Sequence, residues 1–259
     1  MPTFLFDKVI FGPIVSRRLG TSLGINLLPV SSKLCSFNCI YCECGLNPRR
    51  REQKSKLPMR GEVREKLEAK LRNMQAENQP PDVITFAGNG EPTLHPDFAS
   101  IVDDALDLRN RFAPTAKIAV LSNATMLHRD DVFNALLKVD DNILKLDSAM
   151  ENTIRLIDCP TAAFSLEKLI AQLIRFNGRL IIQTMFIRGV WKGETIDNTT
   201  QKEVDEWIKL MEKIAPRQVM IYSIDRDTPI ETLEKTPLDE LEKIAGQLRK
   251  KGIDVQVSG

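Results

Sequence analysis

The sequence lacks several features that would place a protein in a class at once. No apolar run in its 259 residues is long enough to cross a bilayer, so we expect no membrane-spanning segment and no membrane partner. Its first residues lack the basic, apolar and small-residue zones of a secretory signal, and we therefore expect a cytoplasmic protein. Lysine and arginine total 36 against 35 for aspartate and glutamate, which gives no overall attraction to nucleic acid.

Internal repeats, low-complexity stretches and an obvious linker are also missing. We therefore expect one domain over residues 1–259, with residues 1–22 as an N-terminal extension and residues 23–259 as a partial barrel.

Short apolar segments alternate with segments of helical periodicity along most of the chain. The expected strands cover residues 23–28, 82–87, 117–122, 142–147, 180–186, 219–223 and 253–257. The expected helices lie between them, at about residues 63–74, 98–108, 131–137, 166–174, 204–214 and 238–248. Strands joined by crossover helices are parallel, so we predict an α/β fold, a partial (βα)6 TIM-like barrel with parallel strands. Functional groups of such folds gather at the carboxyl ends of the strands.

The five cysteines are unevenly distributed, with four between Cys35 and Cys44 and Cys159 standing apart. In a reducing compartment this clustering favours metal ligation or catalysis over disulfide bonds. Cys35, Cys39 and Cys42 fall within eight residues, so one loop can supply three ligands to a [4Fe-4S] cluster and leave one iron open. An open metal position can bind and activate a small molecule.

A structural zinc site is the alternative interpretation of the same loop, with Cys44 as the fourth ligand in a binding or scaffold protein. Structural zinc sites usually use two separated cysteine pairs, whereas here four thiols share one loop. Cys159 is expected to be a packing residue, as isolated cysteines usually are. No second group of cysteines follows, so we expect no auxiliary iron–sulfur cluster.

The cysteine loop resembles the hallmark Cys-x3-Cys-x2-Cys loop of the radical S-adenosylmethionine (SAM) superfamily, including an aromatic residue, Tyr41, before the third cysteine. Residues 86–94, Phe-Ala-Gly-Asn-Gly-Glu-Pro-Thr-Leu, resemble the Gly-Gly-Glu-Pro segment of that superfamily, with Asn89 in place of the first glycine. The two motifs have the spacing expected for successive strands of its barrel.

The resemblance extends to a poorly characterised, wyosine-synthase-like branch of the superfamily. It rests on residues 11–25, 145–147 and 221–226, and it covers nearly the whole chain. Residues 157–160, Ile-Asp-Cys-Pro, depart from the Asn-Arg-Pro expected there, so no role of that arginine is carried over.

The resemblance implies two cofactors, a [4Fe-4S] cluster and SAM, and an enzyme that cleaves SAM reductively to a 5′-deoxyadenosyl radical. It also implies a reducing electron donor such as flavodoxin or ferredoxin. The substrate is unidentified, whether a small molecule, a peptide or RNA, and tRNA base modification is the alternative within the superfamily. No catalytic residue is assigned.

Polar and glycine residues at the expected strand ends are the candidates for SAM binding. Besides Tyr41, they are Gly88, Asn89, Gly90, Glu91, Ser122, Asn123, Lys145, Asp147, Gln183, Tyr222 and Ser223. The resemblance implies that Glu91 accepts a hydrogen bond from the SAM ammonium group, and the glycines allow close approach of the backbone. Lys145 and Asp147 either contact SAM or substrate or form a structural ion pair.

Basic residues form the last group of candidates. Arg17, Arg18 and Arg226 are each either anion-binding or structural, and the basic run over residues 48–56 is either a solvated loop or a surface for RNA or an acidic electron donor.

Overall fold

The computed structural model describes residues 4–16, 19–48 and 56–259. Arg17, Arg18 and most of the basic run at 48–56 lie outside the described residues. The chain forms two compact units. One contains residues 5–35 and 47–142, here called the N-unit, and the other contains Phe4 and residues 36–46 and 143–259, here called the C-unit.

The N-unit is built on four strands in the order β1-β2-β3-β4. They are β1 (Ile10–Ser16), β2 (Gly20–Ile25), β3 (Val83–Phe86) and β4 (Lys117–Ser122). β2, β3 and β4 are parallel, whereas β1 pairs with β2 in antiparallel fashion, with Ile10 opposite Ile25. Every residue of β3 is buried, as expected of a strand covered on both faces.

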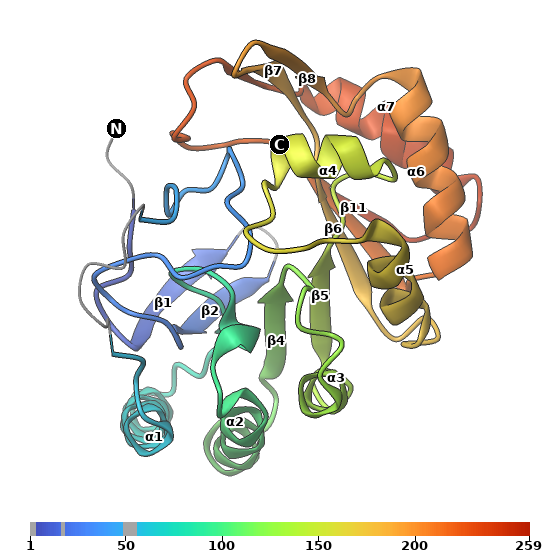
Figure 1. Ribbon diagram of the computed structural model, residues 1–259. Coiled ribbons are helices and arrows are strands. Elements are labelled where there is room, and N and C mark those ends of the chain that lie inside the picture. The colour runs from blue at the N-terminus through green and yellow to red at the C-terminus, as the bar shows by residue number, and fades with distance from the viewer. Residues whose placement is uncertain (1–3, 17–18, 49–55) are drawn as a thin grey trace. The chain divides into compact units, whose positions relative to one another are not determined.

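Three helices of the N-unit lie side by side, as Figure 1 shows. They are α1 (Arg60–Ala76), α2 (Phe98–Phe112) and α3 (Asp130–Leu136), and a short 3-10 helix η1 (Pro92–Leu94) follows β3. The buried face of α1 consists of Val63, Leu67, Leu71 and Met74, the residues whose spacing predicted the helix.

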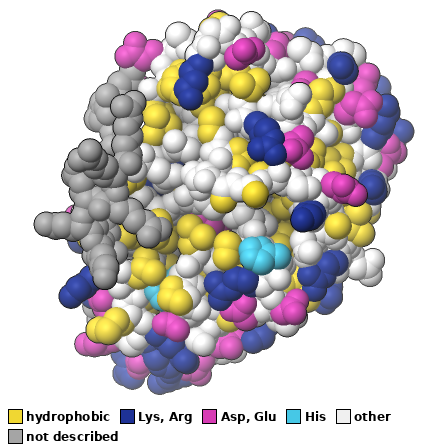
Figure 2. Space-filling model, viewed as in Figure 1, with side chains coloured by type: hydrophobic (Ala, Val, Ile, Leu, Met, Phe, Trp, Pro, Cys, Tyr) yellow, Lys and Arg dark blue, Asp and Glu magenta, His cyan; other side chains and the backbone are white. Residues whose placement is uncertain are grey.

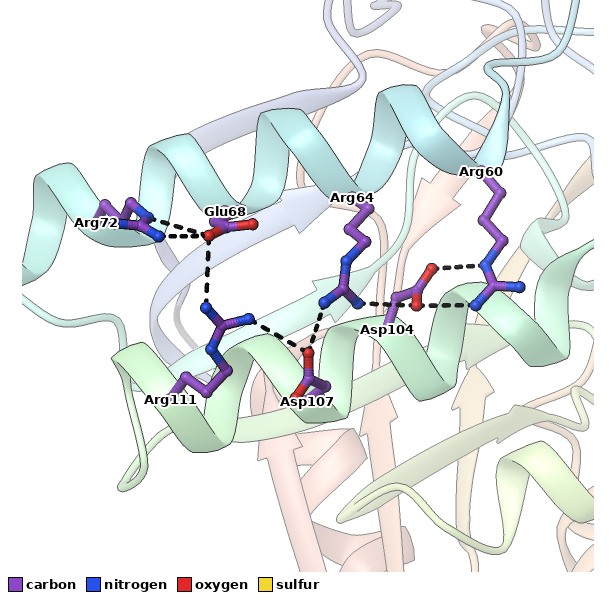
Figure 3. A network of polar contacts seen from close by, with 7 residues as sticks. All are labelled: Arg60, Arg64, Glu68, Arg72, Asp104, Asp107 and Arg111. Carbon is purple, nitrogen blue, oxygen red and sulfur yellow. Dashed lines mark hydrogen bonds and ion pairs between the residues drawn. The ribbon is translucent and has the colours of Figure 1, made fainter.

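A charged network joins the exposed sides of α1 and α2 (Figure 3). The guanidinium group of Arg60 donates to both carboxylate oxygens of Asp104 at 2.7 and 2.9 Å, and Arg64 bridges Asp104 and Asp107. The hydrogen bond from Arg60 holds the pKa of Asp104 below its ordinary value. The network therefore fixes the two helices against each other by charge-assisted contacts at their rim.

The C-unit has four parallel strands and a second, antiparallel sheet. The parallel strands, in the order β5-β6-β9-β11, are β5 (Asp141–Lys145), whose first two residues belong to the N-unit, β6 (Ile181–Met185), β9 (Gln218–Tyr222) and β11 (Val255–Ser258). The antiparallel sheet, in the order β10-β7-β8, consists of β7 (Ile187–Trp191), β8 (Glu194–Asp197) and β10 (Leu233–Lys235).

Four helices complete the C-unit: α4 (Glu151–Ile157), α5 (Leu166–Ile174), α6 (Gln201–Ile214) and α7 (Leu238–Arg249). α6 and α7 pack against each other and are adjacent in Figure 1. Trp207 of α6 is fully buried and makes an edge-on contact with Phe186, with ring centroids 5.2 Å apart.

The predicted α/β class with parallel strands and crossover helices is confirmed. The first predicted strand, residues 23–28, is shifted, because β2 begins at Gly20 and ends at Ile25. β1 lies within the predicted N-terminal extension. The sequence pattern also missed α4 and the sheet of β7, β8 and β10. These elements are short and half exposed, so they carry too little periodicity to be recognised.

No helix within the described ranges has the length and apolar character needed to span a membrane.

Candidate functional site

The start of the cysteine loop is fixed to the glycine-rich segment after β3, within the N-unit. The N–H of Leu34 donates to the carbonyl of Asn89 at 2.9 Å, and the N–H of Glu91 donates to the carbonyl of Leu34 at 3.1 Å. Gly90 has a φ of +134°, and a Cβ there would lie 1.9 Å from the Leu34 carbonyl oxygen. Only glycine fits this contact, which holds the backbone immediately before Cys35.

The side chain of Asn89 serves the fold of the N-unit. It is fully buried, its amide group donates to the carbonyls of Phe6 and Pro29 at 2.9 and 2.8 Å, and its oxygen accepts the N–H of Phe6. Gly88, with φ of +144°, packs against the side chain of Asn26, which would lie 2.4 Å from a Cβ. The glycine backbone was expected to come close to SAM. Within the described residues, Gly88 and Asn89 make their close contacts with other parts of the protein.

Glu91 is a buried carboxylate that joins the ends of β3 and β4. Its Oε1 accepts from the Thr93 N–H and the Ser122 hydroxyl at 3.1 and 2.8 Å, and its Oε2 accepts from the Asn123 N–H at 2.6 Å. Burial raises the pKa of Glu91, and these hydrogen bonds oppose that rise. The predicted residues Glu91, Ser122 and Asn123 therefore form one connected group.

Asn123 links this group to the first cysteine. Its side-chain amide donates to Cys35 Sγ at 3.5 Å, while its side-chain oxygen accepts from the N–H and hydroxyl of Thr125. The carbonyl of Cys35 accepts from Asn47, a residue that the sequence motifs did not indicate. The N-unit thus fixes both the backbone and the sulfur of Cys35.

The rest of the cysteine loop is held by the end of α4, within the C-unit. The N–H of Ile40 donates to the carbonyl of Ile157 at 2.9 Å, and the N–H of Asn38 donates to the carbonyl of Asp158 at 2.8 Å. The N–H of Cys42 donates to the carbonyl of Cys39 at 3.2 Å, so these two cysteines occupy one tight turn.

A buried charged cluster lies beside this turn. Tyr41 donates its hydroxyl proton to Asp147, and Lys145 lies with its Nζ 4.5 Å from the centre of the Tyr41 ring. Lys145 also contacts the carboxylates of Asp147 and Asp158, the latter as an ion pair at 3.0 Å without hydrogen-bond geometry. Cys39 is buried and borders Lys145 and Asp158.

The charges of the cluster act strongly on one another because water is excluded. Burial lowers the pKa of Lys145, but the carboxylates of Asp147 and Asp158 outweigh it and hold that pKa well above its ordinary value. Burial raises the pKa of Asp158 to about 7, against the opposing effect of Lys145. Lys145 is therefore cationic and binds the two carboxylates.

Asp158 is a site residue that the sequence did not reveal. It belongs to the segment that departs from the expected Asn-Arg-Pro, and its partner Lys145 lies thirteen residues earlier in the chain. Asn198 was also missed: its amide donates to the carbonyls of Asp147 and Met185. The departure from the expected motif was the only signal for Asp158, and Asn198 gave none.

The remaining candidates of the C-unit have mixed environments. Gln183 is buried on β6 and is in register with Lys145 on β5. Ser223 is engaged in the fold, since its hydroxyl donates to the Phe186 carbonyl at 2.8 Å and accepts from the Thr236 N–H at 2.7 Å. Tyr222 ends β9 and is half-buried.

Arg226 forms an ion pair with Glu43 of the cysteine loop at 2.8 Å. This contact favours the structural interpretation of Arg226 over anion binding.

Comparison with known proteins agrees with the cysteine loop and the glycine-rich segment. The radical SAM superfamily matches residues 30–157. A UPF0026 protein of Helicobacter pylori is 31% identical over 243 residues, which cover 91% of this chain and 72% of that protein. The chain belongs to the UPF0026 family, within the radical SAM superfamily.

Two further relatives are much longer than the matched region. A protein named GTPase Obg from Brachyspira hyodysenteriae is 30% identical over 92% of this chain, but the match spans only 33% of that protein. A UPF0026 protein of Methanocaldococcus jannaschii is 31% identical over 74% of this chain and 59% of its own length. The chain thus spans between one third and three fifths of these two relatives.

Solved radical SAM structures share the fold. A radical SAM methyltransferase from Sphaerobacter thermophilus superposes with a TM-score of 0.67 over 92% of this chain and 65% of its own, at 15% identity. TYW1 with a lysine-pyruvate adduct bound gives a TM-score of 0.64 over 90% of this chain and 75% of its own, at 19% identity. SuiB of Streptococcus suis, which was solved bound to SAM, gives 0.62 over 90% of this chain and 50% of its own, at 15% identity.

The radical SAM fold uses a [4Fe-4S] cluster and SAM, and the donor set of this chain fits the cluster. Thiolates are the usual ligands of such clusters, and all five cysteines lie in the described residues without forming a disulfide. Cys35 belongs to the N-unit, whereas Cys39 and Cys42 belong to the C-unit. Across the described residues no three His, Cys, Asp or Glu side chains form a metal site. The assignment of Cys35, Cys39 and Cys42 as ligands stays a prediction from the motif.

Proposed function

We propose that this protein is a radical SAM enzyme in which Cys35, Cys39 and Cys42 hold the cluster. When bound, the cluster would supply one electron that splits SAM into methionine and a 5′-deoxyadenosyl radical, and this radical would remove a hydrogen atom from the substrate. The observation that carries this proposal is the hydrogen bond from the Asn123 amide to Cys35 Sγ, together with the fixed backbone of Leu34.

Hydrogen bonds to a cluster sulfur stabilise its negative charge, so the Asn123 amide suits a thiolate ligand better than a neutral thiol. Glu91 holds the Asn123 N–H, and therefore acts on Cys35 through Asn123. We expect the SAM methionine group near this Glu91 group, and SAM or substrate near Lys145, Asp147 and Gln183.

The protein's own residues keep the cysteine loop in place and exclude water. Tyr41 and Cys39 are each 8% exposed, and Asp147 is 1% exposed. Exclusion of water protects a reactive radical from side reactions. The buried Lys145 cluster therefore suits a site of radical chemistry.

Metal analysis tests the proposal directly. After anaerobic reconstitution with iron and sulfide, the chain should contain about four irons and about four acid-labile sulfides, as expected for one [4Fe-4S] cluster. Cys39→Ala should lose most of both, whereas the matched variant Cys44→Ala should keep them. One zinc per chain without iron, or equal loss in both variants, would contradict the proposal and favour the zinc-scaffold alternative.

Product analysis tests the reaction. The reconstituted chain with SAM and dithionite should form 5′-deoxyadenosine, and a substrate should accelerate its formation. Small-molecule, peptide and RNA pools are compared in parallel, and acceleration by unmodified tRNA in particular would support base modification. Failure of a fully loaded chain to form the nucleoside under any of these conditions would contradict SAM cleavage.

A further inference from the structure

A groove of about 910 Å³ lies in the N-unit between the start of β1 and one side of α1. Its floor is apolar and includes the buried residues Val9, Leu28 and Pro58. Met59, which is 74% exposed, and Val30 also line it. An apolar floor with exposed apolar side chains beside it offers a contact for the apolar side chains of a partner.

The lining of the groove carries an excess of positive charge. Among its described lining residues are four lysines, Lys8, Lys56, Lys66 and Lys70, against two acidic residues. Lys66 is paired with Glu62 at 2.6 Å, while the other three lysines form no ion pair with any described residue. The remaining acid is Asp7.

This positive charge is a local feature. The net charge of the whole chain is only +1. On the face shown in Figure 2, lysine and arginine are interspersed with aspartate and glutamate rather than separated by sign. The described lining of the groove, with four lysines against two acidic residues, is therefore complementary in charge to a partner that has acidic side chains around an apolar contact.

The groove is connected to the segment that holds Cys35. The Asn26 N–H donates to the carbonyl of Val9 at 2.8 Å, and Asn89 binds the backbones of Phe6 and Pro29, which flank the groove-lining residues. The carbonyl of the same Asn89 accepts the N–H of Leu34, next to Cys35. An occupant of the groove would therefore lie against the segments that fix the first cysteine.

We propose that this groove docks an acidic protein that delivers the electron needed by the cluster. In each encounter one electron leaves the reduced cofactor of the donor, which is oxidised by one electron, and the cluster is reduced by one. This inference rests on the proposed function, because it assigns the docking surface for its reductant.

The composition of the lining favours a protein over RNA as the occupant. Among the described residues that line the groove there is no arginine and no aromatic side chain, whereas RNA-binding grooves rely on both to stack bases and clamp phosphates. An apolar floor with an exposed methionine instead fits apolar side chains of a protein, and the lysines fit its carboxylates.

Binding of reduced flavodoxin, an acidic flavoprotein, tests the proposal with the full, iron-loaded chain. Lys8→Glu combined with Lys56→Glu reverses two exposed charges of the groove. We expect its Kd for flavodoxin to rise at least tenfold in about 50 mM salt, and the difference from the unmodified chain to shrink in about 500 mM salt, because salt screens such contacts. Lys168→Glu with Lys202→Glu makes the same charge change on α5 and α6 and should alter Kd less than twofold.

The reduction step gives a second readout. Oxidation of flavodoxin hydroquinone by the groove variant should slow at least tenfold, whereas 5′-deoxyadenosine formation driven by dithionite should stay unchanged. Met59→Asp should also weaken flavodoxin binding, because it places a carboxylate in the apolar contact.

Three results would overturn the docking proposal. They are equal effects of the groove and control variants, no effect of either, or weakening of tRNA binding by the groove variant while flavodoxin binding is retained. Iron content is measured on every sample, so a chain that binds no iron contradicts the proposed function, whereas an iron-loaded chain with groove-independent flavodoxin binding contradicts only the docking site.

Discussion

Replacing Gly90 by alanine should destabilise the N-unit strongly. The new Cβ would lie 1.9 Å from the Leu34 carbonyl oxygen and 2.5 Å from its carbon. Both are backbone atoms, so the contact cannot be relieved by rotating a side chain. The φ of +134° is also one that alanine rarely adopts, and this strain alone costs about 1–3 kcal/mol.

To make room for the new Cβ, the Leu34 backbone must move, and this movement breaks the hydrogen bonds that Leu34 makes. Two backbone hydrogen bonds join Leu34 to Asn89 and Glu91, and each contributes about 0.5–1.5 kcal/mol. We therefore expect the free energy of unfolding to fall by about 2–6 kcal/mol, a large part of the roughly 5–15 kcal/mol typical of folded proteins.

Urea unfolding followed by circular dichroism measures this loss. Gly61→Ala is the matched control in the same unit, because a Cβ at Gly61 meets nothing within 4 Å and the residue is helical. It should be neutral or stabilising by up to about 1 kcal/mol. The Gly90 variant should also bind less iron, since Leu34 precedes Cys35. A loss below about 1 kcal/mol for Gly90→Ala would refute the packing described for this segment.

Two further substitutions test the charged clusters. Lys145→Met leaves two buried carboxylates without their cation, so it should cost about 3–5 kcal/mol in urea unfolding, and an unchanged stability would contradict the ion-pair cluster. Asp104→Asn should lower the urea midpoint more than Asp239→Asn, whose i,i+4 partner Lys243 is exposed. Arg60 depresses the pKa of Asp104. The contribution of this pair to the free energy of unfolding is therefore complete above the ordinary carboxyl pKa of about 4, and it is lost as the pH falls through the depressed pKa. The difference between Asp104→Asn and the unmodified chain should therefore shrink in acid, and a difference that grows there would contradict the pairing.

Much of the secondary structure was predictable because its signals are local. The residues of α1 that gave a helical period, such as Val63 and Leu67, are the ones that α1 buries, and the apolar run of β3 is fully buried. Short elements with only one or two buried positions, such as α4 and β8, were missed because so few buried positions do not define a period.

The candidate site was predictable where polar residues follow expected strands, because the carboxyl ends of parallel strands gather at one edge of the sheet. The sequence indicated Glu91, Ser122 and Asn123 through their positions after two strands, and they form one hydrogen-bonded group. The cofactor contact that the sequence proposed for Asn89 stays a prediction, and nothing in the sequence indicated that its side chain binds the backbones of Phe6 and Pro29, 83 and 60 residues away.

By itself the sequence determined the cysteine motif, the alternation of strands and helices, and membership of the radical SAM superfamily, because each depends on residue types at short spacings. Only the tertiary structure decided that Asp158 pairs with Lys145, that Gly90 is required by Leu34, and that a lysine preceding β1 shares one groove with lysines of α1. Those contacts depend on where separate segments pack. Burial of a polar or charged side chain costs free energy unless it is hydrogen-bonded or paired, so packing also decides which residues need a partner.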